Sequence, residues 1–185
     1  MIGKQVVFKI RNGKQIVTGP PKVDKDRIPT PNQQVSQDRF KFSCEYANEA
    51  IKDDALKAAY RKVASRRQSA HNMAFKDAYN PPEVLNIILQ GYKGVAGNII
   101  VVHAVDDFKV KAVNVSIFDK SDNLIEKNEA VSDKHGVVWV YTVTVANVEV
   151  EGCKIVASAV DLPGNEDLME VVISISPTDP VVFGI

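Results

Sequence analysis

The chain has 185 residues, of which 45% are hydrophobic and 25% charged, a composition typical of a folded globular protein with one ordinary domain or two small ones. It excludes a collagen, a disordered chain and a disulfide scaffold. The formal net charge is zero, but up to Pro82 there are 16 Lys and Arg against 8 Asp and Glu, and from Glu83 onward there are 7 against 15. This change from +8 to −8 predicts a basic domain at residues 1–82 and an acidic domain at residues 83–185.

The first residues contain only a short apolar stretch, which Lys9 and Arg11 interrupt, and no small-residue cleavage site. We therefore expect no signal peptide and synthesis in the cytoplasm. No stretch approaches the roughly 20 apolar residues that a membrane-spanning helix needs, so we expect no membrane partner. The two cysteines, Cys44 and Cys153, fall in different halves and predict free, buried thiols.

The first predicted element is a β-hairpin at residues 4–18. Apolar and polar residues alternate on both sides of Asn12-Gly13, two residues that tolerate the positive φ angles of a tight turn. A two-stranded hairpin is only marginally stable alone, so we expect it to pack against something else.

Three helices are predicted after the hairpin. The first begins with a capping box at Thr30-Pro31-Asn32-Gln33. The second opens at Asp53 or Asp54, and the third follows the N-cap candidate Ser69. Pro81-Pro82 ends the third helix, because proline cannot donate the helical hydrogen bond, and we place the domain boundary there.

From Val84 onward the apolar period changes from 3.6 to 2, and short runs rich in Val, Ile and Tyr recur without helices between them. This pattern predicts an antiparallel β-sandwich of seven strands. The expected fold class is therefore α+β, with a hairpin and a small helical domain before the sandwich. The predicted strands are residues 84–89, 98–105, 110–118, 124–130, 137–145, 153–160 and 170–175.

Two stretches of the second half resemble bacterial immunoglobulin-like domains. Residues 102–113, VHAVDDFKVKAV, read as a strand ending in Ala-Val-Asp, a short turn and a strand of alternating valines. Residues 156–165, VASAVDLPGN, are similar to the A-x-D-x-x-G-N phrase common near the end of such domains. The resemblance covers about residues 84–175 and implies an immunoglobulin-like fold but no activity, because such domains serve as spacers, adhesive modules and structural decorations. The chain lacks the two-cysteine bridge of antibody domains, and its Trp139 lies on the predicted fifth strand rather than the third.

The helical half resembles the leading region of uncharacterised bacterial proteins that end in such a domain. That resemblance implies no activity either.

In such a sandwich, the loops at residues 106–108, 131–136 and 161–167 cluster at one end. Carboxylate and amide oxygens at this acidic tip would suit Ca²⁺. Alternatively, they end strands through local hydrogen bonds to the backbone, or they are neutralised by the basic half that Pro81-Pro82 brings to the same end. The candidate Ca²⁺ ligands are Asp106, Asp107, Asp161 and Asn165.

A run of basic side chains on the second predicted helix is the kind of patch from which nucleic-acid binding is argued. The run matches no binding motif, and the acidic half would repel phosphates, so we do not expect a nucleic-acid partner. We assign the run to a solvated or domain-facing surface. It consists of Lys57, Arg61, Lys62, Arg66 and Arg67.

No signature of catalysis is found. The three histidines lie in unrelated contexts without a second His or Cys at metal-ligand spacing, and no G-x-S-x-G, H-E-x-x-H, P-loop or G-x-G-x-x-G occurs. We assign no catalytic residue and no cofactor apart from the Ca²⁺ candidate. A hydrolase with an unrecognised site remains an alternative.

The leading hypothesis is a non-enzymatic binding or structural protein built on an immunoglobulin-like domain. An extracellular style of fold without a signal peptide suggests a component or cargo of a larger bacterial assembly, such as a phage tail-like contractile injection particle, and hence a protein partner. The main alternative is a module that binds Ca²⁺ or a small ligand at the acidic tip. The candidate docking residues are Leu56, Tyr60 and Val63, the hairpin residues Val6, Phe8 and Ile10, and the C-terminal Val181, Val182 and Phe183.

Overall fold

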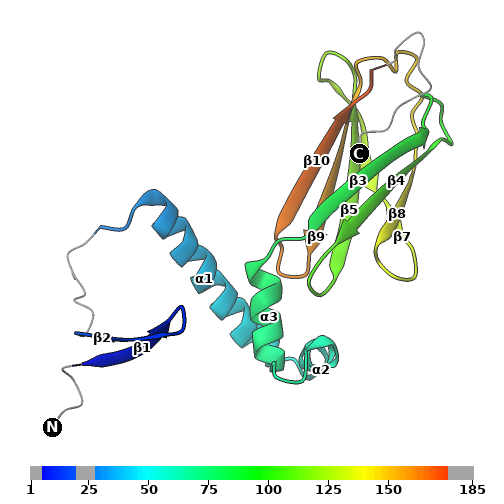
Figure 1. Cartoon of the computed structure of the whole chain (residues 1–185). Coiled ribbons are helices and arrows are strands. Elements are labelled where there is room, and N and C mark those ends of the chain that lie inside the picture. The colour runs from blue at the N-terminus through cyan, green and yellow to red at the C-terminus, as the bar shows by residue number, and fades with distance from the viewer. Residues whose placement is uncertain (1–5, 20–27, 175–185) are drawn as a thin grey trace. The chain divides into compact units, whose positions relative to one another are not determined.

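The computed structural model describes residues 6–19 and 28–174 of the chain (Figure 1). These residues belong to two compact units, one ending at Ser36 and the other beginning at Gln37. The described part contains three helices and ten strands, and every strand pair is antiparallel, so the fold class is mixed α+β. The domain boundary expected after Pro82 lies inside the second unit. That the parts of the chain on either side of Pro82 fold independently stays a prediction.

The first unit contains the β-hairpin that the sequence predicts, formed by β1 (Val7–Arg11) and β2 (Lys14–Thr18). The turn residues have positive φ angles, 49° at Asn12 and 73° at Gly13, as a two-residue turn of the primed type requires. Asn and Gly are the residues that adopt this conformation at least cost, so the hairpin follows directly from its turn sequence.

Helix α1 (Pro31–Ala50) begins in the first unit and continues into the second. Its start is the predicted capping box: the backbone N–H of Gln33 donates to Thr30 Oγ1 at 3.4 Å, and the Thr30 N–H donates to Gln33 Oε1 at 3.1 Å. These two bonds satisfy donors that the first helical turn cannot pair internally, which fixes where α1 begins.

Helices α2 (Asp54–Val63) and α3 (Ala70–Tyr79) also begin where the sequence predicts. The side chains of Asp53 and Ser69 each accept a backbone N–H from the first turn of the helix that follows, at 2.9 and 3.1 Å. Helix α3 ends directly before Asn80 and the two prolines after it, which cannot continue the helical hydrogen bonds.

The three helices share a small core. Phe108, from a loop between two strands, closes it: the ring centroids of Phe108 and Tyr60 lie 4.2 Å apart. The buried members of this core are Ala47, Ala50, Tyr60, Ala70, Met73 and Ala74.

The rest of the second unit consists of two four-stranded sheets, which we call the two-sheet module. One sheet has the order β3-β4-β8-β7, and the other has the order β10-β9-β5-β6. The strands are β3 (Glu83–Gly91), β4 (Ile99–Val105), β5 (Val110–Phe118), β6 (Leu124–Glu129), β7 (Val131–Ser132), β8 (Val138–Thr142), β9 (Lys154–Asp161) and β10 (Glu166–Val172).

Both sheets contribute side chains to one apolar core. Burial alternates along β4, where Ile100, Val102 and Ala104 are fully buried, because successive side chains of a strand point to opposite faces. Val113 and Val115 of β5 are fully buried in the same core from the other sheet. The alternation that predicts these strands from the sequence therefore reflects one buried and one outer face.

The two-sheet module has eight strands where the sequence predicts seven. The chain crosses from one sheet to the other at the buried Ala130, so that β6 pairs with β5 while the short β7 pairs with β8. The last strand begins at Glu166 and not at Glu170, and Glu166 and Asp167 therefore belong to a strand rather than to a loop. On its exposed face Glu166 and Glu170 alternate with Leu168 and Val172, which obscures the apolar pattern of the strand.

None of the helices in the described part is both long and apolar enough to cross a membrane. The two cysteines are free, as the sequence predicts: Cys44 is half-buried and Cys153 fully buried. The Cys153 thiol accepts a hydrogen bond from Asn147 Nδ2 at 2.8 Å and donates to the Glu149 carbonyl at 2.9 Å. The Cys153 thiol is thus buried with both of its hydrogen bonds satisfied by the protein.

Candidate functional site at the junction of helices and sheets

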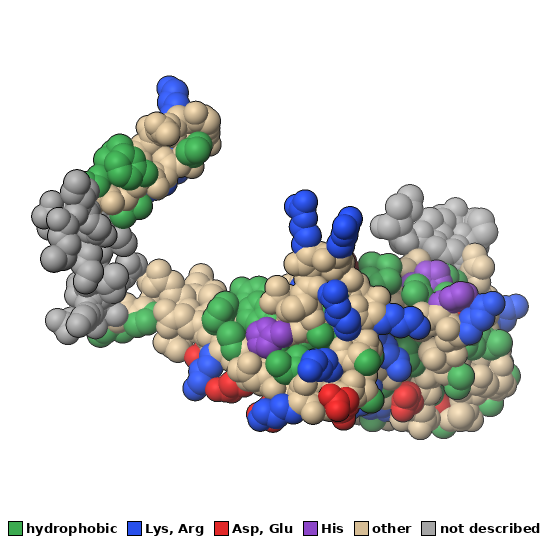
Figure 2. Space-filling model, turned by 90° about the horizontal axis from the view of Figure 1, so that it is seen from below, with side chains coloured by type: hydrophobic (Ala, Val, Ile, Leu, Met, Phe, Trp, Pro, Cys, Tyr) green, Lys and Arg blue, Asp and Glu red, His purple; other side chains and the backbone are tan. Residues whose placement is uncertain are grey.

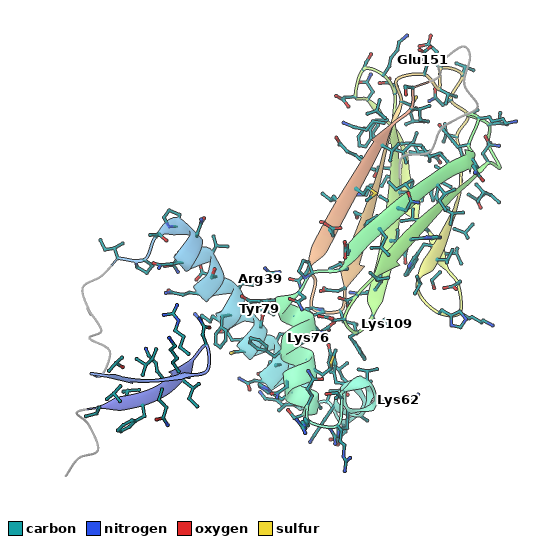
Figure 3. All side chains as sticks on the ribbon, viewed as in Figure 1. Arg39, Lys62, Lys76, Tyr79, Lys109 and Glu151 are labelled. Atoms are coloured by element: carbon teal, nitrogen blue, oxygen red, sulfur yellow. The ribbon has the colours of Figure 1, made fainter. Side chains whose placement is uncertain are left out.

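Two loops of the two-sheet module contact the C-terminal half of α3 (Figure 3). They are residues 106–109, between β4 and β5, and residues 162–165, between β9 and β10. Pro82 is fully buried and leads from α3 into β3, which places the helices at this end of the module. We call this region the junction. It contains all four side chains that the sequence marks as candidate Ca²⁺ ligands.

Asp107 binds α3 through two charged or polar contacts. Its Oδ1 lies 2.6 Å from Lys76 Nζ, and its Oδ2 accepts a hydrogen bond from Asn80 Nδ2 at 2.6 Å. Partial burial alone would raise the pKa of Asp107, but the bonds from Asn80 and Lys76 and the charge of Lys76 outweigh it and lower the pKa below its usual value. The acidic loop therefore pairs directly with a lysine of the basic half.

Asp161 and Asn165 form the second contact. The buried Asp161 accepts the backbone N–H groups of Gly164 and Asn165 at 2.7 and 2.6 Å, and its Oδ2 accepts Asn165 Nδ2 at 2.7 Å. The same amide of Asn165 donates to the carbonyl of Ala78 in α3 at 3.2 Å. Burial raises the pKa of Asp161 despite these donors. The A-x-D-x-x-G-N phrase thus shapes a loop that holds α3.

A chain of buried hydroxyl and carboxyl groups runs through the helices to the junction. The hydroxyl oxygens of Tyr46 and Tyr60 lie 2.8 Å apart, and the Tyr60 hydroxyl donates to Asp77 Oδ2 at 2.5 Å. Tyr60 and Asp77 have no exposed surface. Burial raises the pKa of Tyr60, and its bonds to Asp77 and Tyr46 raise that pKa further, so Tyr60 stays a neutral donor.

Asp77 of α3 lies beside the loop carboxyl of Asp106. The Oδ1 atoms of both residues are buried and lack a hydrogen-bond donor among the described residues. Burial raises the pKa of Asp77 to about 8 against the opposing effect of the Tyr60 hydrogen bond, and the neighbouring Asp106 and Asp161 raise it as well. Asp77 therefore carries a proton at neutral pH, and this proton supplies the missing donor toward Asp106.

Most oxygens of the candidate Ca²⁺ ligands at the junction accept hydrogen bonds from the protein, and the calcium site stays a prediction. Ca²⁺ takes six to eight oxygen ligands. Both carboxylate oxygens of Asp107 and of Asp161 already accept hydrogen bonds, and Asp106 Oδ2 accepts the backbone N–H groups of Phe108 and Lys109. In the part of the chain that the structure describes, no three His, Cys, Asp or Glu side chains are placed to hold a metal ion. The junction is built to join α3 to the sheets.

The candidate docking residues on α2 do not form one exposed surface. Leu56 is half-buried and packs against the helical core, Tyr60 is fully buried in it, and Val63 is 50% exposed. The C-terminal candidates, residues 181–183, lie outside the described residues.

Two of the candidate docking residues of the hairpin are more exposed than those of α2. Phe8 and Ile10 are 76% and 74% exposed, and Val17, opposite Phe8 in the hairpin register, is 57% exposed. Because side chains alternate along a strand, these three share one face, and Lys9 and Arg11 lie on the other. We call the face of Phe8, Ile10 and Val17 the apolar hairpin face.

The role of Asp77 and of the tyrosines bound to it was absent from the sequence-based predictions. A signal was present, since Asp77 lies four residues after Met73 and directly before Ala78, in the apolar pattern of α3. A carboxyl at a core position predicts a buried partner, but the partner loop is distant in sequence and only the tertiary structure identifies it.

Comparison with known proteins does not identify a family. No protein-family model matches the chain, and no curated protein matches it. A solved structure described as an engineered protein is similar over 55% of this chain and 23% of its own length, with 14% sequence identity and a TM-score of 0.34.

Proposed function

We propose that the protein is a non-enzymatic binding protein that works as a component of a larger assembly, with the hairpin as its docking element and the two-sheet module as an immunoglobulin-like domain. The strand pairing supports the second point. The first, second, fifth and sixth strands of the module share one sheet in the order β3-β4-β8-β7, and the others share the second sheet. Immunoglobulin domains divide their strands in a similar way between an ABED and a CFG sheet.

The apolar hairpin face is the observation that carries the proposal. Two-stranded hairpins are marginally stable alone and need a packing partner. Phe8, Ile10 and Val17 lie on one face and are mostly exposed, and no residue of the hairpin is fully buried in the described segment 6–19. Burying such a face on a partner stabilises both the contact and the hairpin.

The charge of the first unit indicates what kind of partner fits. Up to Ser36 the sequence has seven Lys and Arg against two Asp and Glu. Lys9, Arg11 and Lys14 lie on the hairpin face opposite the apolar one. We therefore propose a protein partner with an apolar groove in an acidic surface, since opposite net charge on the two partners directs the encounter.

The test uses the full chain in its native cell. We expect the wild-type chain to sediment with a large particle, and the double variant Phe8→Ser, Ile10→Ser to move to the slowly sedimenting fraction. The reason is that this variant removes most of the apolar area of the hairpin face while leaving both buried cores unchanged. Thermal unfolding of the purified variant should match that of the wild type.

A matched control replaces two exposed apolar residues of the two-sheet module, Leu85→Ser and Leu124→Ser, which are 48% and 54% exposed. This control should still sediment with the particle. A wild-type chain that diffuses as a free monomer in native lysate would contradict the proposal. So would equal loss of sedimentation in both double variants.

A further inference from the structure

The helical region contains a basic hollow of about 630 Å³ between α2 and the turn that leads to α3. Figure 2 shows Lys and Arg side chains gathered near the middle of the face it presents. Four cationic side chains and one carboxylate line the hollow, together with small and polar residues. The charged members are Lys57, Arg61, Arg66, Arg67 and Asp54.

Among the residues that the structure describes, none of the four cations of the basic hollow forms a salt bridge, although Asp54 lines the same hollow. The salt bridges found within residues 6–19 and 28–174 all involve other lysines. Elsewhere in the second unit, exposed lysines such as Lys52 and Lys120 do pair with a nearby carboxylate. The basic hollow therefore gathers four cations around a single carboxylate, with no ion pair of the kind that the chain forms elsewhere.

The turn that carries Arg66 and Arg67 is held in place by three hydrogen bonds. Arg61 Nη1 donates to the Gln68 carbonyl at 2.6 Å. The Gln68 N–H donates to the Ser65 carbonyl at 3.0 Å, and the Ser65 N–H donates to Gln68 Oε1 at 3.3 Å. These bonds close the turn over the end of α2 and keep two guanidinium groups beside the cations of that helix.

Holding like charges together costs free energy, which an anion bound among them would recover. Guanidinium groups present paired N–H donors that match the oxygens of phosphate. We infer that the basic hollow binds a small ligand that carries two or more phosphate groups. Ser69 and Ala70, at the start of α3, line the same hollow, so the positive end of that helix adds to the attraction.

A compact ligand fits this site better than a nucleic acid does. The four cations line one open hollow, so a short anion can reach all of them together. No aromatic side chain of the described residues lines it, and Tyr60, the aromatic residue of α2, is fully buried and bound to Asp77, so bases would find no platform on which to stack. From Glu83 onward the chain has 15 acidic against 7 basic residues, which repels a long polyanion.

Calorimetric titration of the full chain with tripolyphosphate tests the inference, with inorganic phosphate and a DNA duplex as comparison ligands. We expect one tripolyphosphate per chain, bound more tightly than inorganic phosphate. The double variant Arg66→Gln, Arg67→Gln should lower the affinity for tripolyphosphate by roughly tenfold or more, because both guanidinium groups are exposed and free to bind the anion. Both positions are surface positions and the variant relieves repulsion between like charges, so it should unfold at or slightly above the wild-type temperature.

The matched control is Lys111→Gln, Lys127→Gln, which removes the same charge from exposed positions on β5 and β6. It should bind tripolyphosphate as the wild type does. Equal weakening in the two variants would show attraction by net charge alone and would overturn the inference. The absence of tripolyphosphate binding would overturn it as well, and so would tighter binding of DNA with several chains per duplex, which would indicate a nucleic-acid surface.

Discussion

The two apolar cores of the second unit differ in the number and size of their buried side chains. Seventeen buried apolar residues from both sheets form the core of the two-sheet module, with Trp139 and several Val and Ile among them. The helical core has six buried residues, of which four are alanine. The sheets therefore bury enough apolar side chain to be stable, whereas the helices bury little and depend on contacts from outside.

The junction supplies those contacts in two forms. Phe108 adds an aromatic ring to the helical core, and the Tyr60–Asp77 hydrogen bond belongs to a polar network buried beside that core. A buried polar network stabilises only when its members are paired, so the helices should respond to pH and salt more strongly than the sheets do.

The first expected effect comes from Phe108→Ala. Removing the ring leaves a cavity at the edge of the helical core and should lower the free energy of unfolding of the helices by about 2–3 kcal/mol. Helical circular dichroism should then be lost at lower urea than the fluorescence of Trp139, which reports on the sheet core.

A matched control is Phe118→Ala on β5. Phe118 is only half-buried, and its ring lies 5.0 Å from Lys154 Nζ, far from the helices. We expect the two probes to stay together in this variant. If circular dichroism and Trp139 fluorescence also change at the same urea concentration in Phe108→Ala, the helices and sheets unfold as one unit. The contrast between the two cores would then be wrong.

The second effect is a dependence on pH carried by Asp77. Its pKa is about 8 in the folded chain, whereas the pKa of an unperturbed aspartate is 3.8, so between these pH values the folded state holds a proton that the unfolded state lacks. Stability should therefore fall as pH rises from about 4 to 8, by at most about 1.4 kcal/mol for each pH unit, and level off above 8.

Asp77→Asn should remove this slope. The amide keeps an acceptor for Tyr60 and offers a permanent donor toward Asp106, so the variant should exceed the wild type in stability at pH 8 and differ little near pH 4. Urea unfolding at several pH values measures both curves. Glu170→Gln, at an exposed position, should keep the wild-type slope, and an unchanged slope in Asp77→Asn would show that another group titrates.

The smallest expected effect comes from the ion pair of Lys76 with Asp107. The two side chains are 47% and 24% exposed, so Lys76→Gln should cost about 0.5–1 kcal/mol at low salt and less at high salt. Lys52→Gln, which breaks the more exposed pair with Glu49, is the control and should cost less. Equal effects would mean that the junction pair contributes no more than a pair on the surface of α1.

Elements governed by local rules could be predicted from the sequence. The hairpin turn at Asn12-Gly13, the capping box at Thr30 and the caps at Asp53 and Ser69 all depend on residues within four positions of one another. The local geometry of the chain fixes them, so their sequence signals suffice.

Features that depend on distant contacts could be predicted only in part. The acidic loops were expected beside the basic helices, and Asp107 does pair with Lys76. The raised pKa of Asp77 was not foreseeable, because it depends on burial and on Asp106 and Asp161, which are distant in sequence. The start of β10 was missed because the strand opens with the charged Glu166 and Asp167, which nevertheless pair with β9.

The Phe108 ring comes from the two-sheet module, yet it completes the core of the helices. Asp106 and Asp161, which raise the pKa of Asp77, come from the same module. A fragment that ends at Pro81-Pro82 would keep all three helices but lose the ring and both carboxyls. The change of composition at Pro81-Pro82 is therefore a poor place to cut the chain, because the helices would be left with an incomplete core.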